Sequence, residues 1–354
     1  MTWAPTTDQL LDLDGVRWRA DSFEFELRDQ QGTVLGMLHP DMGRPPVITN
    51  DTTAAVPRTM TNVHLPASEG ADIDVIRTRL VPFMVLQNGE RFQLGEFLWA
   101  SDARPQRSWG QEHATTLADK MVMFNQGLPA TLGWGPGADI GLAVLGVALG
   151  VLPLDQIVID PISAALAVGV THPIGKARRQ VLAEFMANVG FLPPFVDRLG
   201  RLNLVNPPDM ATVDPALVYD VGGRIIDGSV SYSDDLIDAP NVFRVYENSG
   251  QATLVGTYSV PASAPHSVAN RGYEIGVSEP ASGLGTLARA NAAARALATT
   301  RNVTYRWASW DSTLDPRHDT WDPVRFLGDV WMETRQTQQL RSGGVHSHLA
   351  RQVF

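Results

Sequence analysis

The sequence predicts a mainly β protein in which two β-barrel-like domains flank a small α/β domain. Apolar residues alternate with polar ones at period two through most of residues 1–120, and turn signals separate the runs. Over residues 121–209 the spacing becomes helical and the composition richer in glycine and alanine. Alternation returns over residues 210–335, where a helix at 284–300 interrupts it. The polar residues 336–354 are predicted to form a loose or partner-dependent tail.

The N-terminal block is predicted to consist of short strands joined by tight turns. Alternating runs at Val16–Ala20 and Phe23–Leu27 lead to a turn at Asp29–Gly32 and a returning strand. Further strands are predicted at 46–50, 59–65, 74–86 and 91–100. The dipeptide Asn88-Gly89 between the last two is a strong hairpin signal. This pattern favours a barrel or sandwich that follows an N-terminal extension.

The middle segment is predicted to mix helices and strands. Asp139 is placed to cap a helix that runs to about Leu149. Strands are predicted at 156–160 and 164–169. After Ile174, apolar residues recur at helical spacing as far as Gly190, where glycine favours a left-handed cap. Two short apolar runs on either side of the turn at 197–201 then predict a β-hairpin that ends before Pro207-Pro208.

The third block is predicted to return to strands. These are expected at 218–221, 224–232, 241–246, 254–260, 303–309 and 323–333. The helix at 284–300 is built from strong helix formers, mainly alanine, arginine and leucine.

The bulk composition excludes several classes of protein. The chain of 354 residues carries a formal net charge of −10, which argues against a protein that grips nucleic-acid phosphates. The chain has no cysteine, so disulfide frameworks, thiolate zinc sites and cysteine nucleophiles are excluded. No signal peptide is visible at the amino terminus. Only Lys120 and Lys176 are lysines, and this bias towards arginine indicates a GC-rich genome.

A glycine-rich segment offers a candidate cofactor loop, but its pattern favours a turn. Residues Gly133–Gly137 are followed by Gly141, yet Pro136 interrupts the loop and no acid follows at the spacing of a dinucleotide site. We therefore predict a tight turn before a helix, and no cofactor. The apolar segment Ile140–Leu154 has 15 residues, whereas a membrane-spanning helix needs about 20. A buried helix is predicted, without stable membrane insertion.

Two groups of residues were considered as metal ligands. His318 lies near Asp315 and Asp319, and His346 lies two residues from His348. Neither group has a third or fourth ligand at a recognisable spacing. Turn chemistry explains the first group, and the second lies in the predicted loose tail. No metal site is predicted.

No catalytic residue is predicted either. Asp214, Asp234 and Asp235 could supply the two carboxylates of a glycoside hydrolase, but sequence spacing cannot place them face to face. The sequence contains neither a Gly-x-Ser-x-Gly elbow nor a His-Glu-x-x-His motif. The chain is therefore predicted not to be an enzyme. The tryptophans of the last β block are predicted to pack in a core and not to form a ligand platform: Trp307, Trp310, Trp321 and Trp331.

Three stretches, in this order and spacing, resemble the tail hub proteins of long-tailed bacteriophages. Residues 46–65 resemble the opening strand pair of that family, in which an aspartate-bearing turn leads to an Arg-Thr strand. Residues 80–98 resemble its next hairpin, which ends in Leu-Gly-Glu-Phe at 94–97. Residues 174–208 resemble the helix and hairpin near the end of its insert, with an Asp-x-x-Gly-x-Leu turn that begins at Asp197. Residues 1–45 extend beyond the shared part, and the last 20 residues have no counterpart.

The resemblance implies a structural virion protein with the tail hub fold. Hubs of this family form a homotrimeric ring at the distal end of the tail. The ring joins the distal tail protein to tail fibre or tip proteins, around a lumen that holds the tape measure protein and later passes DNA. Catalytic, cofactor-binding and metal-binding residues are not implied. The arginine bias suggests a phage of a GC-rich, actinobacterial host.

Alternatives from other classes remain open from the residues alone. These are a cell-wall hydrolase of the tail tip and a carbohydrate-binding module that recognises a receptor. The basic side chains Lys176, Arg178 and Arg179 are interpreted as a solvated helix face. Contact of this face with a neighbouring subunit is the competing hypothesis.

Overall fold

The computed structural model describes residues 22–65, 73–103, 106–107, 110–111, 113–220, 224–235, 237–248, 253–281, 283–301 and 304–353. The predicted strand at Val16–Ala20 lies outside these residues. The N-terminal block forms strands as predicted, and its turns contain glycine at positive φ at Gly32 and Gly89. Its strands are β1 (Ser22–Arg28), β2 (Val34–Leu38), β3 (Val47–Asp51), β4 (Arg58–Leu65), β5 (Arg79–Val85), β6 (Arg91–Gln93), β7 (Phe97–Ala103), β8 (Gln106–Arg107), β9 (Gly110–Gln111) and β10 (His113–Asp119).

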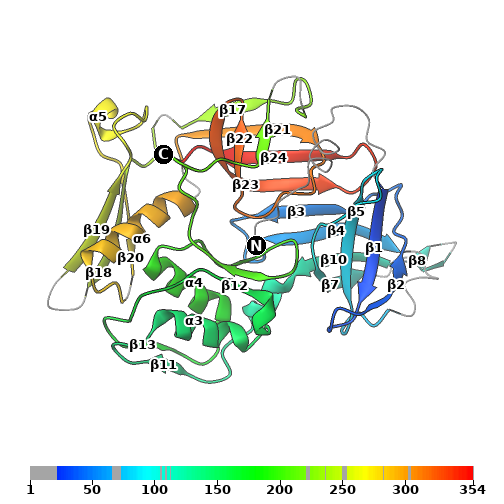
Figure 1. The fold of residues 1–354 in the computed structure, drawn as a ribbon, viewed down its shortest axis with the longest axis horizontal. Helices are drawn as coiled ribbons and strands as arrows, with labels where there is room; N and C mark the ends of the chain where they lie inside the picture. The colour runs from blue at the N-terminus through cyan, green and yellow to red at the C-terminus, as the bar shows by residue number, and fades with distance from the viewer. Residues whose placement is uncertain are drawn as a thin grey trace.

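Strands from the two ends of the chain belong to one open sheet. The C-terminal contribution is β16 (Leu217–Tyr219), β17 (Ser231–Asp234), β21 (Arg306–Thr313), β22 (Pro323–Phe326), β23 (Asp329–Gln339) and β24 (Val345–Arg351). The main strand order is β17-β21-β24-β23-β3-β4-β10-β7-β5-β1-β2, in a sheet of 14 strands. Figure 1 shows the red C-terminal strands lying beside the blue N-terminal ones. The predicted mainly β architecture is confirmed, but the described strands close no barrel.

Strand β23 joins the two halves of the sheet. Its first residues pair with β22, its last residues pair with β3, and β24 follows it along the other side. The register places Arg335 opposite Asp51 and Gln339 opposite Val47, all antiparallel. The N-terminal and C-terminal blocks are thus hydrogen-bonded to each other through their backbones.

The prediction of a loose tail at residues 336–354 is wrong. Residues 336–339 are the end of β23, and β24 lies between β21 and β23. Alternate residues of β24 point to the same face and are buried there: His346, His348 and Ala350. The segment looked loose because these buried positions are polar, and their polar partners lie far away in the sequence.

The middle segment combines short strands with helices and is called the α/β unit below. Its elements are the 3-10 helices η1 (Lys120–Asn125) and η2 (Leu154–Gln156), helices α3 (Ile140–Leu149) and α4 (Arg178–Val189), and strands β11 (Leu132–Trp134), β12 (Ile157–Ile159), β13 (Val170–His172), β14 (Phe195–Val196) and β15 (Leu202–Leu204). Asp139 caps α3 by accepting a hydrogen bond from the Leu142 backbone N–H at 2.9 Å. Gly190 ends α4 at φ 78°. The strand predicted at 164–169 is wrong, because Ala165 forms only a single bridge and β13 begins at Val170.

A second small unit projects from the large sheet. Strands β18 (Val242–Asn248), β19 (Thr253–Ser259) and β20 (Gly276–Pro280) form a separate sheet, joined by the short helix α5 (Val268–Arg271). Helix α6 (Leu287–Thr300) lies across β18 and β19 and also packs on α4 (Figure 1). The strand predicted at 224–232 is wrong in its bounds. The strand in this part of the chain is β17, which begins only at Ser231 and ends at Asp234.

Each unit has its own apolar core. The α/β unit buries one face of α3 and of α4, including Val144 and Phe185. The N-terminal strands bury a second cluster around Met60 and Phe97. A third cluster around Trp310 lies among the C-terminal strands. Among the described residues, no helix combines the length and apolar character that crossing a membrane requires.

Candidate functional site

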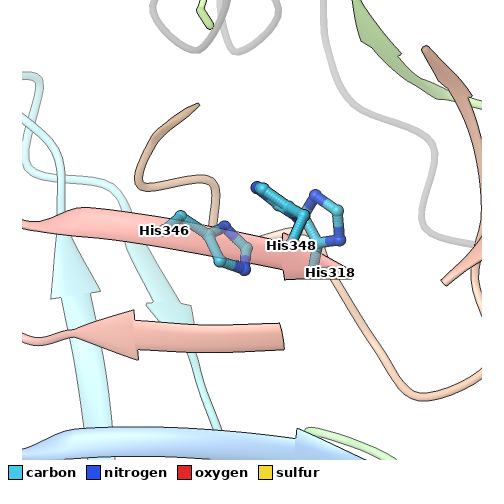
Figure 2. A group of neighbouring side chains, drawn as sticks. All are labelled: His318, His346 and His348. Carbon is cyan, nitrogen blue, oxygen red and sulfur yellow. The ribbon is translucent and has the colours of Figure 1, made fainter. Parts of the chain in front are cut away.

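A cluster of buried histidines lies in the C-terminal part of the large sheet. His346 and His348 project from the same face of β24, because residues two apart on a strand share a face. His318 comes from the segment between β21 and β22, and the exposed fractions of these histidines are 0–3%. Figure 2 shows the two strand histidines side by side, with His318 next to His348. The structure therefore unites the two groups that the sequence presented separately.

A single carboxylate holds two of the three rings. Glu333 on β23 accepts from Nδ1 of His318 at 2.8 Å and from Nδ1 of His348 at 2.5 Å. A register shift between Glu333 and Arg335 interrupts the pairing of β23 with β24. Such a bulge allows Glu333 and Gln336, three residues apart, both to be buried.

The remaining ring nitrogens contact neutral polar groups. The Tyr219 hydroxyl contacts Nε2 of His318, and the Ser312 hydroxyl lies 2.8 Å from Nε2 of His348. The Gln336 side-chain oxygen lies 2.7 Å from Nε2 of His346. Nδ1 of His346 is buried and has no hydrogen-bond partner among the residues that the structure describes.

Burial and charge set the protonation of this cluster. Burial alone would raise the pKa of Glu333, but His318 and His348 lower it to about 2. Burial acts to lower the pKa of His318, and the charge of Glu333 reverses this so that the pKa is raised. Burial lowers the pKa of His346 well below its ordinary value. Glu333 is therefore ionised at neutral pH, and His346 is neutral.

A second buried group fixes the segment that carries His318. Asp315 binds both Arg224 and Arg317, and Arg317 donates to it from Nη2 at 2.6 Å. Four residues later, Asp319 accepts from the buried Arg58 of β4 at 2.6 Å. The Asp315–Arg224 pair thus fixes the start of the segment 315–319, and the Asp319–Arg58 pair ties its end to β4. They explain the two aspartates that the sequence suggested as metal ligands.

The three candidate hydrolase carboxylates have separate partners. Asp234 on β17 pairs with Arg306 at 2.7 Å, and Asp214 pairs with Arg325 at 3.1 Å. Asp235 accepts from the Ile237 and Asp238 backbone N–H groups in a turn. The structure thus gives each carboxylate a structural contact of its own.

The aromatic and glycine candidates are also structural. Trp310, Trp321 and Trp331 are buried, as predicted, whereas Trp307 is half-buried. Trp310 stacks on Phe326 with ring centroids 4.0 Å apart. Gly133 lies within β11, and only the second half of the predicted loop, Gly135–Gly137, forms the turn that leads to α3. On the predicted basic face, Lys176 pairs with Glu184 at 2.6 Å.

The overall architecture is a fold seen in solved tail proteins of bacteriophages and prophages. A tail protein from Neisseria meningitidis superposes with a TM-score of 0.62 at 14% identity, covering 94% of this chain and 96% of that one. The 43 kDa tail protein of prophage MuSo2 from Shewanella oneidensis superposes with a TM-score of 0.58 at 12% identity. The match covers 93% of this chain and 98% of that one. The prophage tail protein gp18 from Listeria monocytogenes superposes with a TM-score of 0.58 at 10% identity. The match covers 92% of this chain and 94% of that one. No protein-family model matches the chain, and no curated protein matches it.

Proposed function

We propose that this chain is a structural subunit of a phage tail, namely the hub at its distal end. In this role it forms a homotrimeric ring that connects the distal tail protein and the tape measure protein to tail fibre or tip proteins. The ring frames the channel through which DNA leaves during genome ejection, and the chain catalyses no reaction. The virion would be that of a long-tailed phage of a GC-rich, actinobacterial host.

One observation carries this proposal above the others. The fold shared with solved tail proteins extends over 92–94% of the chain and includes the α/β unit, the large sheet and the projecting unit. The residue patterns that resemble tail hubs lie at 46–65, 80–98 and 174–208, so fold and sequence support the same class. An acidic protein suits a channel for DNA, because like charges keep DNA from adhering.

The two ends of the large sheet support assembly with further copies. Among the described residues, β2 is the last strand at one end and exposes Val34, Leu35 and Met37 by 41–56%. At the other end β17 exposes Tyr232 by 50%. Exposed apolar edges of this kind pair readily with other chains. We propose that the two β blocks complete barrel-like structures across subunit boundaries in a closed three-fold ring.

Light scattering on the purified protein tests the ring. We expect a mass of three times 38.5 kDa. The Leu35→Arg variant should shift the mass towards that of the monomer, because it places a charge on the β2 edge. Ile76→Arg is the matched control, since Ile76 is 85% exposed and lies outside the strands. A stable monomer of the unaltered protein would contradict the proposed trimer.

Antibody labelling of virions tests the location. Antibodies against this chain should decorate the end of the tail that is remote from the capsid. Decoration along the tail tube, or at the capsid, would assign the protein to another part of the virion.

A further inference from the structure

Three buried histidines lie close enough together to be candidate ligands of a single metal ion. One ring nitrogen from each of His318, His346 and His348 lies within 4.8 Å of the others. The ring centroids are 4.0–5.0 Å apart (Figure 2). Zinc binds imidazole nitrogen at about 2.0–2.1 Å, so tetrahedral ligands lie roughly 3.4 Å apart. Rotation of the rings that moves each nitrogen by about 1 Å would close the site.

The hydrogen bonds around the rings follow the pattern of metal-binding histidines. Such histidines donate their other ring N–H to a carboxylate or carbonyl oxygen, which fixes the ring and its tautomer. Here Glu333 accepts from Nδ1 of His318 and of His348, and the Gln336 oxygen lies 2.7 Å from Nε2 of His346. With protons assigned to these nitrogens from the network, each ring keeps a lone pair on its other nitrogen.

Nδ1 of His346 is a buried ring nitrogen that an ion in the cluster could contact. Its Nδ1 atom is buried and contacts no donor among the described residues. A buried acceptor without a partner is rare in native proteins, because it has lost its water without replacement. A metal ion is a partner that fits, since a lone pair on a neutral imidazole is what it binds.

We propose that His318, His346 and His348 bind a divalent transition-metal ion, zinc in the first instance, at a buried structural site. Nε2 of His318 and of His348 would exchange their contacts with Tyr219 and Ser312 for the ion. Imidazole suits zinc, and the nearby Glu333 carboxylate offsets the added charge. The ion would tie β24 to the segment that precedes β22. This inference is independent of the proposed hub function.

Full burial dictates how the site is tested. An ion that no solvent path reaches is taken up while the chain folds, so the protein should retain it through purification. We expect a stoichiometric zinc content in protein that is produced without a polyhistidine tag and washed with chelator. The His346→Gln and His348→Gln variants should lose the zinc. His266→Gln should keep it, because His266 is a buried histidine that stacks on Tyr305 outside the cluster.

A measurement on the unaltered protein covers the case in which the variants do not fold. X-ray absorption at the zinc edge should show imidazole scattering from about three ligands. Protein from cells grown with cobalt should show the visible absorption of cobalt bound by nitrogen ligands. Purified protein that holds only trace metal, or zinc that persists in folded His346→Gln and His348→Gln, would overturn the proposal.

Discussion

Asp315 is the acid shared by two arginines in a buried charge cluster. It is fully buried, and it pairs with Arg224 and Arg317, which are also buried. Burial acts to raise the pKa of Asp315, but the Arg317 hydrogen bonds and the charges of both arginines hold it well below its ordinary range. Removal of the carboxylate would take from two buried guanidinium groups the anion that both of them contact.

The Asp315→Asn variant should therefore be strongly destabilised. We expect the free energy of unfolding at pH 7 to fall by about 3–5 kcal/mol, as when one partner of a buried ion pair is removed. Because the folded pKa is depressed, this contribution is present above the ordinary pKa of 3.8 and is lost as pH falls below it. Urea unfolding at pH 7 and at about pH 3 should show a smaller difference between the two proteins at the lower pH, because the loss begins below pH 3.8 and is complete only at the much lower folded pKa.

Asp214→Asn is the control for this comparison. Asp214 pairs with Arg325, but its side chain is 93% exposed, so its loss should leave the urea midpoint unchanged. If the two variants lost equal amounts of unfolding free energy, burial would not be the reason for the stabilising effect of Asp315.

The sequence analysis named the three histidines of the cluster, but it predicted neither their meeting nor the part of Glu333. His318 and His346 are 28 positions apart, and Glu333 lies between them in the chain. Their proximity depends on the pairing of β21, β23 and β24, which no local pattern specifies. The prediction of buried tryptophans succeeded for Trp310, Trp321 and Trp331, but not for the half-buried Trp307, because burial of large aromatics follows largely from hydrophobicity.

At the scale of elements, close approach of helix α6 to strand β19 requires glycine. A Cβ atom placed on Gly256 would lie 2.0 Å from the backbone carbonyl carbon of Ala290. The face of α6 that is buried consists largely of small side chains, including Ala290, Ala293 and Ala294. Helix and sheet therefore pack with almost no side chain between them at this point.

Gly256→Ala should separate the helix from the sheet. Overpacking of this kind costs about 1–3 kcal/mol, and the rigid backbone of Ala290 leaves little room for relief. Thermal unfolding followed by circular dichroism measures the loss of stability.

Gly146→Ala is the matched control, since Gly146 is exposed in α3 with open space around its Cβ position. That change should stabilise the protein by about 0.5–1 kcal/mol, because alanine favours the helix. A variant Gly256→Ala as stable as the original would refute the close contact.

Elements with local signals were predicted well, and those with distant partners were not. The helix that ends at Gly190 and the hairpin around 197–201 follow from apolar spacing and turn residues. The separate sheet of β18, β19 and β20 was not predicted as a unit, because parallel pairing of β18 with β20 leaves no local signature.

At the scale of the whole molecule, the C-terminal strands hold the N-terminal block in place. Strand β23 pairs with β3, and β24 covers the other side of β23. The sequence predicted two β blocks as separate domains, and the boundaries at 120, 209 and 335 remain predictions. In the structure the two blocks share one sheet. Sequence patterns cannot reveal this, because a strand shows the same alternation of apolar and polar residues whichever strand it pairs with.

Truncation of the chain after Leu340 should abolish the native fold. Loss of β24 exposes the paired edges of β21 and β23 and removes His346 and His348 from the core. We expect an insoluble or rapidly proteolysed product, measured by solubility and limited proteolysis. Arg341→Ala, an exposed change in the turn before β24, should behave as the unaltered protein does. A soluble, protease-resistant truncation would show that β24 is dispensable.

The pairing of β3 with β23 also sets the order of events during synthesis. Asp51 lies opposite Arg335. At about 5–20 residues per second, the ribosome makes the second partner roughly 15–60 s after the first. During that interval β3 can pair with β4 on one side, but its other edge lacks β23, a state open to aggregation and to chaperones. Completion of the sheet therefore waits for β23 and β24, so the surfaces of the whole sheet form only after these strands have been made.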